Sequence, residues 1–348
     1  MQPIRIQAVG TAVPPYRVDQ QTIRDAVPLV FRSAYAEIDR LVSLFDNTGV
    51  QTRYFSQPLE WYRHNHTFAE SNAAYEKSAL QLSEAAARAA LEKAGADPRE
   101  IGVLIFVSTT GLATPSLDSK LIKALGLSRN TARVPVWGLG CAGGVAGLAR
   151  AVELCRARPG QKALLVAVEL CSLTFQKGDL SKANLVSTSL FADGAAAVVL
   201  GEDGEGPEVL GSYSTLFEDS EYVMGWELVE TGFKVRLSKD LPSITKNRVP
   251  DEIGQACQVW GIDPGAVRHF VLHPGGAKVL AAFADSLQLG HGRLCHAVSV
   301  LRDYGNMSSP TVLFILREFL EHTPKAGDYG LMLGMGPGFS AEQVLFRW

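Results

Sequence analysis

The chain of 348 residues has no long apolar run, no excess of charge of one sign and no close pair of cysteines. Its continuous apolar segments, such as residues 195–200, are far shorter than the roughly 18 residues that span a bilayer. The opening residues also lack the basic start and apolar centre of a signal peptide. We therefore expect a cytoplasmic protein without a transmembrane segment.

Charge and cysteine content argue against two further classes of protein. The 33 Lys and Arg residues nearly balance the 36 Asp and Glu residues, and no basic run offers a patch for nucleic acid. Cysteines stand at positions 141, 155, 171, 257 and 295. This odd, scattered set lacks the spacing of a disulfide framework or a zinc knuckle, which fits a reducing compartment.

The composition that remains is that of a folded chain with a large core. Hydrophobic residues make up 47% of the sequence and charged residues 20%, so global disorder is not expected. The length exceeds that of most single domains. We expect two domains or one large duplicated unit.

A repeat in the sequence favours the duplicated unit. Residues 72–94 have the composition of a helix, with a possible cap at Ser71 and an end at Gly95, and residues 103–107 read as a buried strand. The Gly-Ala-Asp-Pro turn at residues 95–98 is matched by Gly-Ile-Asp-Pro at residues 261–264, an offset of 166. Such a match predicts two copies of one α/β unit.

The offset nearly holds further along the chain. Strand-like residues 162–168 fall on residues 328–334, and Gly140-Cys141 lies opposite Gly305-Asn306 at an offset of 165. Closing strands are expected at residues 195–200 and 343–346. Strands this apolar need cover on both faces, which predicts layers of sheet and helix with pseudo-twofold-related halves at residues 1–205 and 206–348.

Cys141 is the strongest candidate for a catalytic group. Small residues surround it in Gly-Leu-Gly-Cys-Ala-Gly-Gly, and a helix is expected at residues 145–155, which places the thiol at a helix N-terminus. The helix dipole and free N–H groups there favour a thiolate and can hold an oxyanion. The alternative is a small buried hydrophobic residue, the usual role of a free cysteine.

The repeat also indicates a role for His273 and Asn306. His273 ends a strand before Pro-Gly-Gly and could be a base or a structural histidine, and Asn306 could cap the helix expected at residues 311–320. The pseudo-axis brings Asn306 opposite Cys141 and His273 to a neighbouring strand end. We therefore predict one Cys-His-Asn site.

These segments, with Tyr304-Gly-Asn-Met-Ser-Ser309 and Gly336-Pro-Gly-Phe339, resemble type III polyketide synthases, the chalcone-synthase-like branch of the thiolase fold. Residues 137–144, and residues 46–50 with the Arg53-Tyr54-Phe55 segment that follows, are most similar to bacterial alkylresorcinol and alkylpyrone synthases. The resemblance implies a thiolase-like αβαβα layered fold and a homodimer, with a residue near Thr114 reaching the neighbour's cavity.

The resemblance also implies roles for individual residues. Cys141 would accept the acyl group, with His273 and Asn306 completing the triad. Phe191, otherwise a core residue, would be the gatekeeper between the CoA tunnel and the cavity. The implied cavity residues are Thr109, Thr114, Thr174, Val235 and Gly338. Arg40 alone matches the basic residues that hold CoA phosphates in plant members, because Ser43 and Asn47 stand at the other positions.

The implied reaction is that of an acyltransferase without a bound cofactor. A medium- or long-chain fatty acyl group from acyl-CoA would load onto Cys141, be extended with malonyl-CoA and cyclise to an alkylpyrone or alkylresorcinol. Small residues at Thr114 and Val235 favour a long chain. Chain length, the number of extensions and the ring closure are not encoded in a motif.

Three alternatives stay open at this point. An initiating ketoacyl synthase shares the fold and the triad, although such enzymes carry His-Gln-Ala-Asn where this chain has His273-Pro-Gly-Gly. A catalytically silent scaffold is the second. Metal binding through His64 and His66 is the third, and it lacks further ligands at the usual spacing, which is more typical of a polar loop.

Overall fold

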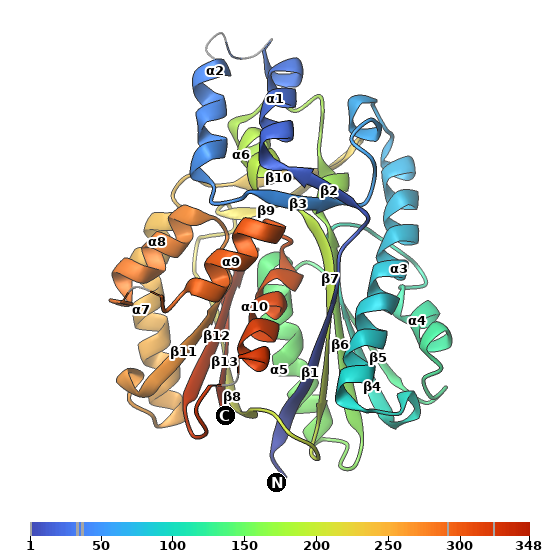
Figure 1. Ribbon diagram of the computed structural model, residues 1–348, viewed down its shortest axis with the longest axis vertical. Coiled ribbons are helices and arrows are strands. Elements are labelled where there is room, and N and C mark those ends of the chain that lie inside the picture. Colours follow the sequence, from blue (N-terminus) through green and yellow to red (C-terminus); the bar gives the residue numbers. More distant parts are fainter. Residues whose placement is uncertain (1, 33–34, 36–37, 291, 323) are drawn as a thin grey trace.

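The structure is a computed structural model that describes residues 2–32, 35, 38–290, 292–322 and 324–348, with side chains except those of Asp39 and Arg40. Its described residues form one mixed sheet of nine strands (Figure 1). In spatial order the strands are β11 (Val267–Leu272), β12 (Tyr329–Gly336), β13 (Ser340–Arg347), β8 (Glu208–Leu216), β1 (Ile4–Ala12), β7 (Asp193–Gly201), β6 (Lys162–Leu170), β4 (Ile101–Val107) and β5 (Ala132–Val136).

Helices and two small hairpin-like pairs complete the fold. The helices are α1 (Gln20–Phe31), α2 (Ile38–Leu41), α3 (Phe68–Ala94), α4 (Asp118–Leu125), α5 (Gly143–Arg156), α6 (Lys182–Leu190), α7 (Leu241–Trp260), α8 (Ala277–Ser286), α9 (Cys295–Tyr304) and α10 (Ser309–Glu321). The small sheets pair β2 (Tyr16–Asp19) with β3 (Thr52–Phe55), and β9 (Met224–Val229) with β10 (Gly232–Leu237). Short 3-10 helices are η1 (Val42–Asn47), η2 (Trp61–Arg63), η3 (Pro98–Glu100), η4 (Gly140–Ala142), η5 (Cys171–Thr174) and η6 (Pro264–Ala266).

The duplicated unit predicted from the sequence is confirmed. In the first copy β4 runs parallel to β6, and β6 antiparallel to β7. In the second, β11 and β12 are parallel, and β12 and β13 are antiparallel. The strands expected at residues 195–200 and 343–346 lie within β7 and β13.

The two Gly-x-Asp-Pro turns share one geometry. Gly95 ends α3 at φ +59° and Gly261 ends α7 at φ +69°, the left-handed region that suits glycine. Asp97 Oδ1 accepts a hydrogen bond from the N–H of Arg99 at 2.9 Å, and Asp263 Oδ1 accepts one from Gly265 at 2.8 Å. Each aspartate thereby starts the 3-10 turn that leads into a buried parallel strand.

The first helix of the repeat begins earlier than the sequence predicts. Thr67, not Ser71, is the N-cap, because its side chain accepts from the N–H of Glu70 while the Glu70 carboxylate accepts from the N–H of Thr67. This reciprocal pair is a capping box. It adds a turn, so α3 starts at Phe68.

The elements form five layers, as the thiolase-like prediction requires. The sheet bends at a short junction where β1 meets β8 over two residue pairs. Helices α5 and α10 lie between its halves, since α5 contacts β4, β6, β12 and β13, and α10 contacts β1, β7, β6 and β11 (Figure 1). Helix α3 covers β1, β6 and β7, and α7 packs against β8. The buried cover on both faces explains why β4, β6 and β7 are almost wholly apolar.

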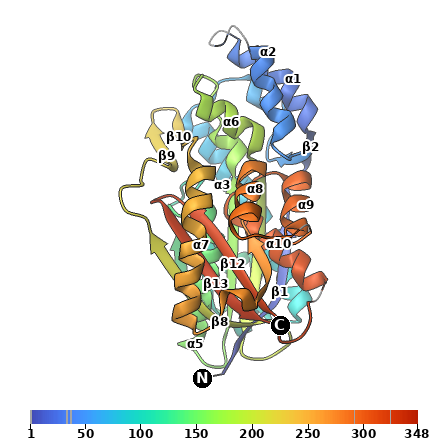
Figure 2. The same ribbon diagram turned by 90° about the vertical axis from the view of Figure 1, so that its left-hand side faces the viewer.

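One end of the molecule is capped by smaller elements. Helices α1, α2 and α6 and the β9–β10 pair lie there, opposite the end that holds both chain termini (Figure 2). Strands β4, β6 and β11 end toward this cap, and α5 and α10 begin beneath it (Figure 1). No helix in the described part of the chain is long and apolar enough to cross a membrane.

Candidate active site

Cys141 lies in the 3-10 turn η4, immediately before α5. The turn is held from two sides: the N–H of Gly140 donates to Thr109 Oγ1 at 3.1 Å, and a Cβ on Gly140 would lie 2.7 Å from Pro337 Cδ. Gly140 has φ +46°, so it suits this close approach. Cys141 keeps some exposed surface, as a thiol that meets a substrate must.

Asn306 lies beside that thiol. The side chains of Ser308 and Asn306 both hydrogen bond to Cys141, and these bonds offset part of the rise in the thiol pKa that burial causes. Asn306 Nδ2 also donates to the carbonyl of Gly275 at 3.1 Å, and its Oδ1 accepts from the N–H of Ser308 at 2.8 Å. The Asn306 amide is therefore fixed by both of its polar atoms, and it does not cap α10, whose N-cap is Ser308.

Ser308 has an uncommon backbone conformation, with φ +58° and ψ −127°. A non-glycine residue in such a region costs on the order of 1–3 kcal/mol and persists where its surroundings enforce it. Here its N–H is bonded to Asn306 and its side chain reaches Cys141. The strained backbone conformation of Ser308 thus directs its hydroxyl toward Cys141, the candidate nucleophile.

His273 directly follows β11, and the neighbouring strand β12 links it to the turn that carries Cys141. Its N–H donates to the carbonyl of Leu333 at 2.9 Å, and a Cβ on the next residue, Gly334, would lie 3.1 Å from the carbonyl oxygen of Cys141. Asn306 binds Gly275, two residues past His273. The structure therefore brings together the strand end carrying His273, the turn carrying Cys141 and the loop carrying Asn306.

The imidazole of His273 is buried, and neither ring nitrogen has a hydrogen-bond partner among the residues that the structure describes. Buried polar atoms are seldom left unpaired, so such a side chain indicates a place where a ligand binds. Burial lowers the pKa of His273 to about 4, which leaves the ring neutral and able to accept a proton at neutral pH.

Burial has the opposite effect on the thiol. It is the largest cause of a pKa of about 11 for Cys141, and the negative charge of Glu169 contributes to the same rise. Burial thus disfavours each charge alone, whereas a thiolate–imidazolium pair of Cys141 and His273 would carry no net charge. Transfer of a proton from Cys141 Sγ to the His273 ring does not change the number of protons in the site. The ion pair therefore remains a prediction.

Glu169 is a buried carboxylate beside the site that the sequence did not single out. It lies near the end of β6, where Oε2 accepts from the N–H of Thr109 at 2.9 Å and from the hydroxyl of Thr110 at 2.8 Å, and Oε1 accepts from Ser309 at 3.0 Å. Burial raises the pKa of Glu169 to about 7. A single acidic residue in the apolar run of residues 162–170 was the signal that could have revealed it.

Phe191 borders the Asn306 loop. The two residues form an isolated bridge, in which the N–H of Asn306 donates to Leu190 and the N–H of Ala192 donates to Asn306, both at 2.9 Å. The ring of Phe191 lies 6.3 Å from that of Trp226 in β9. Phe191 is half-buried, so it is not the core residue that its local sequence alone would favour.

The predicted cavity residues differ in their surroundings. Thr109 touches the Cys141 turn through Gly140, and Thr174 in η5 donates to the carbonyl of Cys171 at 2.8 Å. Val235 is buried in β10, which packs against η5. Thr114 is exposed in this single chain.

Gly338 belongs to the loop between β12 and β13. It has φ +128° and is half-buried, and a Cβ there would lie 3.1 Å from Leu216 Cδ1. Its neighbour Pro337 packs against Gly140. The loop therefore supports the nucleophile turn from the second half of the chain.

The remaining predicted groups lie elsewhere. Arg40 is in α2, and its side chain lies outside the described residues. His64 is exposed beside Glu60, whereas His66 stacks on Trp61 with ring centroids 3.7 Å apart. These two histidines therefore make separate local contacts.

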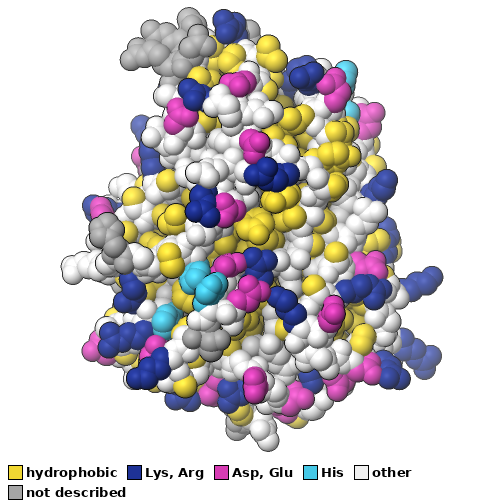
Figure 3. All heavy atoms as spheres, viewed as in Figure 1, with side chains coloured by type: hydrophobic (Ala, Val, Ile, Leu, Met, Phe, Trp, Pro, Cys, Tyr) yellow, Lys and Arg dark blue, Asp and Glu magenta, His cyan; other side chains and the backbone are white. Residues whose placement is uncertain are grey.

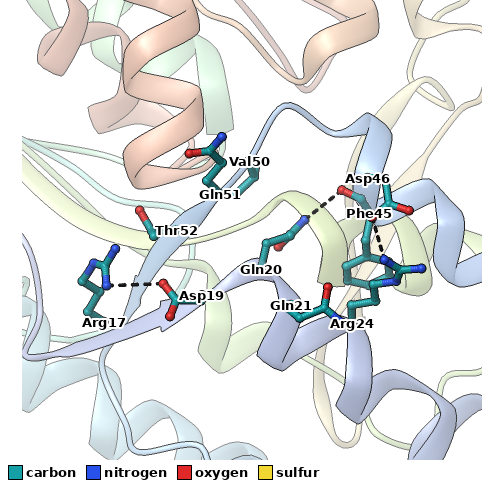
Figure 4. A pocket seen from close by; sticks show the side chains of 10 residues that line it. All are labelled: Arg17, Asp19, Gln20, Gln21, Arg24, Phe45, Asp46, Val50, Gln51 and Thr52. Carbon is teal, nitrogen blue, oxygen red and sulfur yellow. Dashed lines mark hydrogen bonds and ion pairs between the residues drawn. The ribbon is translucent and has the colours of Figure 1, made fainter.

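A surface groove of about 470 Å³ lies near the capped end (Figure 4). Its two arginines are paired with carboxylates, Arg17 with Asp19 at 3.3 Å and Arg24 with Asp46 at 2.9 Å. Gln20 in this groove also accepts from Arg53 at 2.8 Å. The groove is thus a polar surface feature connected to the interior through Gln20.

Comparisons with known proteins cover the whole chain. The families described as "Chalcone and stilbene synthases, N-terminal domain" and "C-terminal domain" match residues 2–204 and 208–348. A Bacillus subtilis (strain 168) protein named for chalcone synthase is 40% identical over 99% of this chain and 98% of its own length. The 1,3,6,8-tetrahydroxynaphthalene synthase of Streptomyces peucetius subsp. caesius is 39% identical, covering 99% of this chain and 93% of that protein.

Solved structures agree with the sequence matches. The crystal structure of the 1,3,6,8-tetrahydroxynaphthalene synthase from Streptomyces coelicolor A3(2), described as a bacterial type III polyketide synthase, superposes with a TM-score of 0.94 at 30% identity. The match covers 99% of each chain. The layers and the bent sheet are therefore shared over the full length.

Proposed function

Because this chain belongs to the chalcone and stilbene synthase family of type III polyketide synthases, a class of acyltransferases, we propose that it loads a medium- or long-chain fatty acyl group from acyl-CoA onto Cys141 and extends it with malonyl-CoA. The observations that carry the proposal are the contact of Cys141 with Ser308 and Asn306, and the buried imidazole of His273, which has no hydrogen-bond partner among the described residues.

Loading begins with attack of Cys141 Sγ on the thioester carbonyl of acyl-CoA. His273 takes the thiol proton as the new C–S bond forms, and CoA leaves as its thiol after receiving that proton. The neutral ring favoured by burial is the form that can act as this base. The product is an acyl thioester on Cys141.

Extension begins when malonyl-CoA loses CO₂. The enolate that remains carries negative charge on its thioester oxygen, and the His273 ring N–H and the Asn306 amide can donate to it in a site with little water. The enolate carbon then attacks the acyl carbonyl, forming a C–C bond and releasing the Cys141 thiolate. The extended chain is then a CoA thioester, and Cys141 takes it back with release of CoA before the next round, until the chain cyclises to an alkylpyrone or alkylresorcinol.

An apolar lining supports a fatty starter. The rings of Phe191, Trp226 and Phe233 lie in a row with centroids 6.3 Å and 6.4 Å apart, and Val235 pairs with Trp226 across β9 and β10. Phe233 also contacts Trp137 and Phe68. This group of side chains lies next to the Asn306 bridge through Phe191, where an alkyl chain on Cys141 would extend.

A second candidate is favoured by the names of the relatives. Tetrahydroxynaphthalene and phloroglucinol, for which two bacterial relatives are named, are rings without an alkyl tail. An enzyme that makes such a ring would use malonyl-CoA as the starter and for every extension. Mass spectrometry of products from malonyl-CoA alone and with acyl-CoA starters of increasing length separates the two. Products that ignore the starter would reject the fatty acyl proposal.

The same reactions address the remaining alternatives. Product formed from malonyl-CoA without an acyl-carrier protein would exclude the ketoacyl synthase, and absence of any turnover would favour the scaffold. No step of the scheme needs a bound cofactor. We assign the nucleophile to the half at residues 1–205 and the His–Asn pair to the half at residues 206–348, with Arg40 as the group for the CoA phosphates.

A homodimer is the expected assembly. Strand β5 lies at the edge of the sheet and pairs only with β4 in the described part of the chain. Leu112 and Trp137 near it are exposed apolar side chains, with 40% and 53% of their surface accessible. Thr114 lies in the same loop as Leu112. Its exposure in one chain is what a residue reaching a neighbour's cavity would show, and sedimentation velocity tests the dimer.

A further inference from the structure

Helices α9 and α10 form a pair whose connecting loop carries Asn306. The loop spans residues 305–308, between the end of α9 at Tyr304 and the start of α10 at Ser309. The open end of the pair lies in the opposite direction, where α9 begins and α10 ends. A link across that open end would fix both helices that support the Asn306 loop.

Three potential metal ligands gather at this open end. One ligand atom from each of His296, Glu318 and His322 lies within 4.8 Å of the others. His296 is in the first turn of α9, Glu318 is in the last turns of α10, and His322 directly follows that helix. Histidine and acidic side chains lie side by side on the face over α9 and α10 (Figure 3).

Packing restricts these side chains. The ring of His296 contacts that of Phe319 at 4.6 Å and that of His322 at 5.2 Å. Nδ1 of His322 lies 2.8 Å from the carbonyl oxygen of Glu318, so a proton on Nδ1 leaves Nε2 free to bind a metal. Metal-binding histidines commonly donate their second ring N–H to such an acceptor.

Glu318 is oriented as well. Arg317 Nη2 lies 2.6 Å from Glu318 Oε1, which leaves Oε2 as the ligand oxygen. The Arg317 guanidinium competes with a metal ion for the negative charge of Glu318, and it also holds that carboxylate in place. An imidazole binds a metal through a ring-nitrogen lone pair, and metal binding releases any proton held on that nitrogen.

We propose that His296, Glu318 and His322 form a binding site for a divalent transition metal, with Zn²⁺ the best match to two imidazoles and one carboxylate. Zinc ligands at about 2.0–2.1 Å in tetrahedral geometry lie roughly 3.3 Å apart, so the ligand atoms must approach. The exposed His322 side chain supplies that movement. Water would fill the fourth position, and the metal would tie the first turn of α9 to the end of α10.

The test uses the full chain, free of any affinity tag and treated with a chelator. A Cys295→Ser background removes the exposed thiol next to His296, which could bind zinc on its own. Calorimetric titration with Zn²⁺ should give one ion per chain. We expect His296→Asn and His322→Asn each to weaken binding by at least about tenfold, whereas His64→Asn, an exposed histidine outside the cluster, should leave it unchanged.

Thermal unfolding gives a readout that does not depend on catalysis. Zinc should raise the Tm of the parent chain and of His64→Asn in a saturable manner, and it should fail to do so in the two cluster variants. Crystals soaked in Zn²⁺ should show an anomalous peak between the three side chains. Unchanged zinc affinity in both cluster variants, or a peak elsewhere, would overturn the site.

Discussion

The carbonyl oxygen of Phe191 accepts a hydrogen bond of 2.9 Å from Nη1 of Arg53, whose guanidinium lies in the protein interior. The same nitrogen donates to Thr188 at 2.7 Å, and Nη2 donates to Gln20 at 2.8 Å. Burial lowers the pKa of Arg53 to about 9. Three acceptors thus hold a buried cation, and one of them belongs to the proposed gatekeeper.

Arg53→Met should therefore destabilise the chain. It removes the donors of three acceptors, at about 1–3 kcal/mol for each group left unpaired, so we expect a loss of at least about 3 kcal/mol. Urea unfolding measures it. Arg63→Met, at an exposed arginine, is the matched control and should unfold like the parent chain. Equal stability of the two variants would contradict the account of Arg53.

Cys141→Ala should abolish polyketide formation and keep part of the malonyl-CoA decarboxylation. Only the first reaction needs the thiol, so product should fall by roughly 10³-fold or more. Release of CO₂ and acetyl-CoA is followed beside product formation. Cys295→Ala, at an exposed cysteine, serves as the control. Full product formation by Cys141→Ala would reject this residue as the nucleophile.

Asn306→Ala should show the reverse pattern. Acyl loading on Cys141, seen by mass spectrometry, should persist, while decarboxylation should fall by about 10²–10³-fold because the enolate loses a donor. The amide also bonds Gly275 and Ser308, so circular dichroism must first show a folded variant. Decarboxylation at the parent rate would remove Asn306 from the mechanism.

His273→Ala should shift the pH dependence of Cys141 alkylation to higher pH. With the ring present, the thiol proton can move within the site, so iodoacetamide should react at neutral and mildly acidic pH. Without it, the proton must leave to solvent from a thiol whose pKa burial raises to about 11. Peptide mass spectrometry compares Cys141 with the exposed Cys295 in the same sample. An identical profile in the variant would show that His273 does not accept the proton.

Glu169→Gln should change how stability depends on pH. The pKa of Glu169 is raised to about 7, so the stabilising neutral form is fully present below about pH 4.5 and is lost as pH rises through 7. The variant lacks this loss. Its stability relative to the parent should therefore increase between pH 5 and 8, by on the order of 3 kcal/mol.

The substituted amide can fit the same contacts. Its oxygen can accept from Thr109 and Thr110, and its NH₂ group can donate to the Ser309 hydroxyl, which accepts as readily as it donates. Urea unfolding at several pH values measures the difference. Asp193, another buried carboxylate with a raised pKa, is present in both chains and cancels in the comparison. A pH-independent difference would contradict the charge argument.

Much of the fold followed from local signals and the repeat. Glycine and aspartate in the turns at Gly95 and Gly261 specify the same geometry twice, so the order of helix, turn and strand could be predicted. The start of α3 was misplaced because Thr67 and Ser71 are both acceptable caps. Only Glu70, three residues after Thr67, distinguishes them.

The site was predictable where the repeat placed residues, and obscure where backbone conformation mattered. Cys141 and Asn306 occupy equivalent positions in the two copies. Ser308 was missed because its positive φ is not encoded by its residue type. The buried role of Arg53 was missed because a lone arginine is usually exposed. The His296 and His322 cluster depends on two helices that meet through tertiary packing.

The close packing of α5 and α10 between the two halves of the bent sheet has a consequence for how such a site can arise. Helices α5 and α10 meet so closely that a Cβ on Gly144 would lie 2.3 Å from the carbonyl oxygen of Ser309. The sulfur of Cys141 lies just before α5 and the amide of Asn306 just before α10, and each helix comes from a different copy of the repeat. A polypeptide with one copy of the repeat could form the same site only as a dimer.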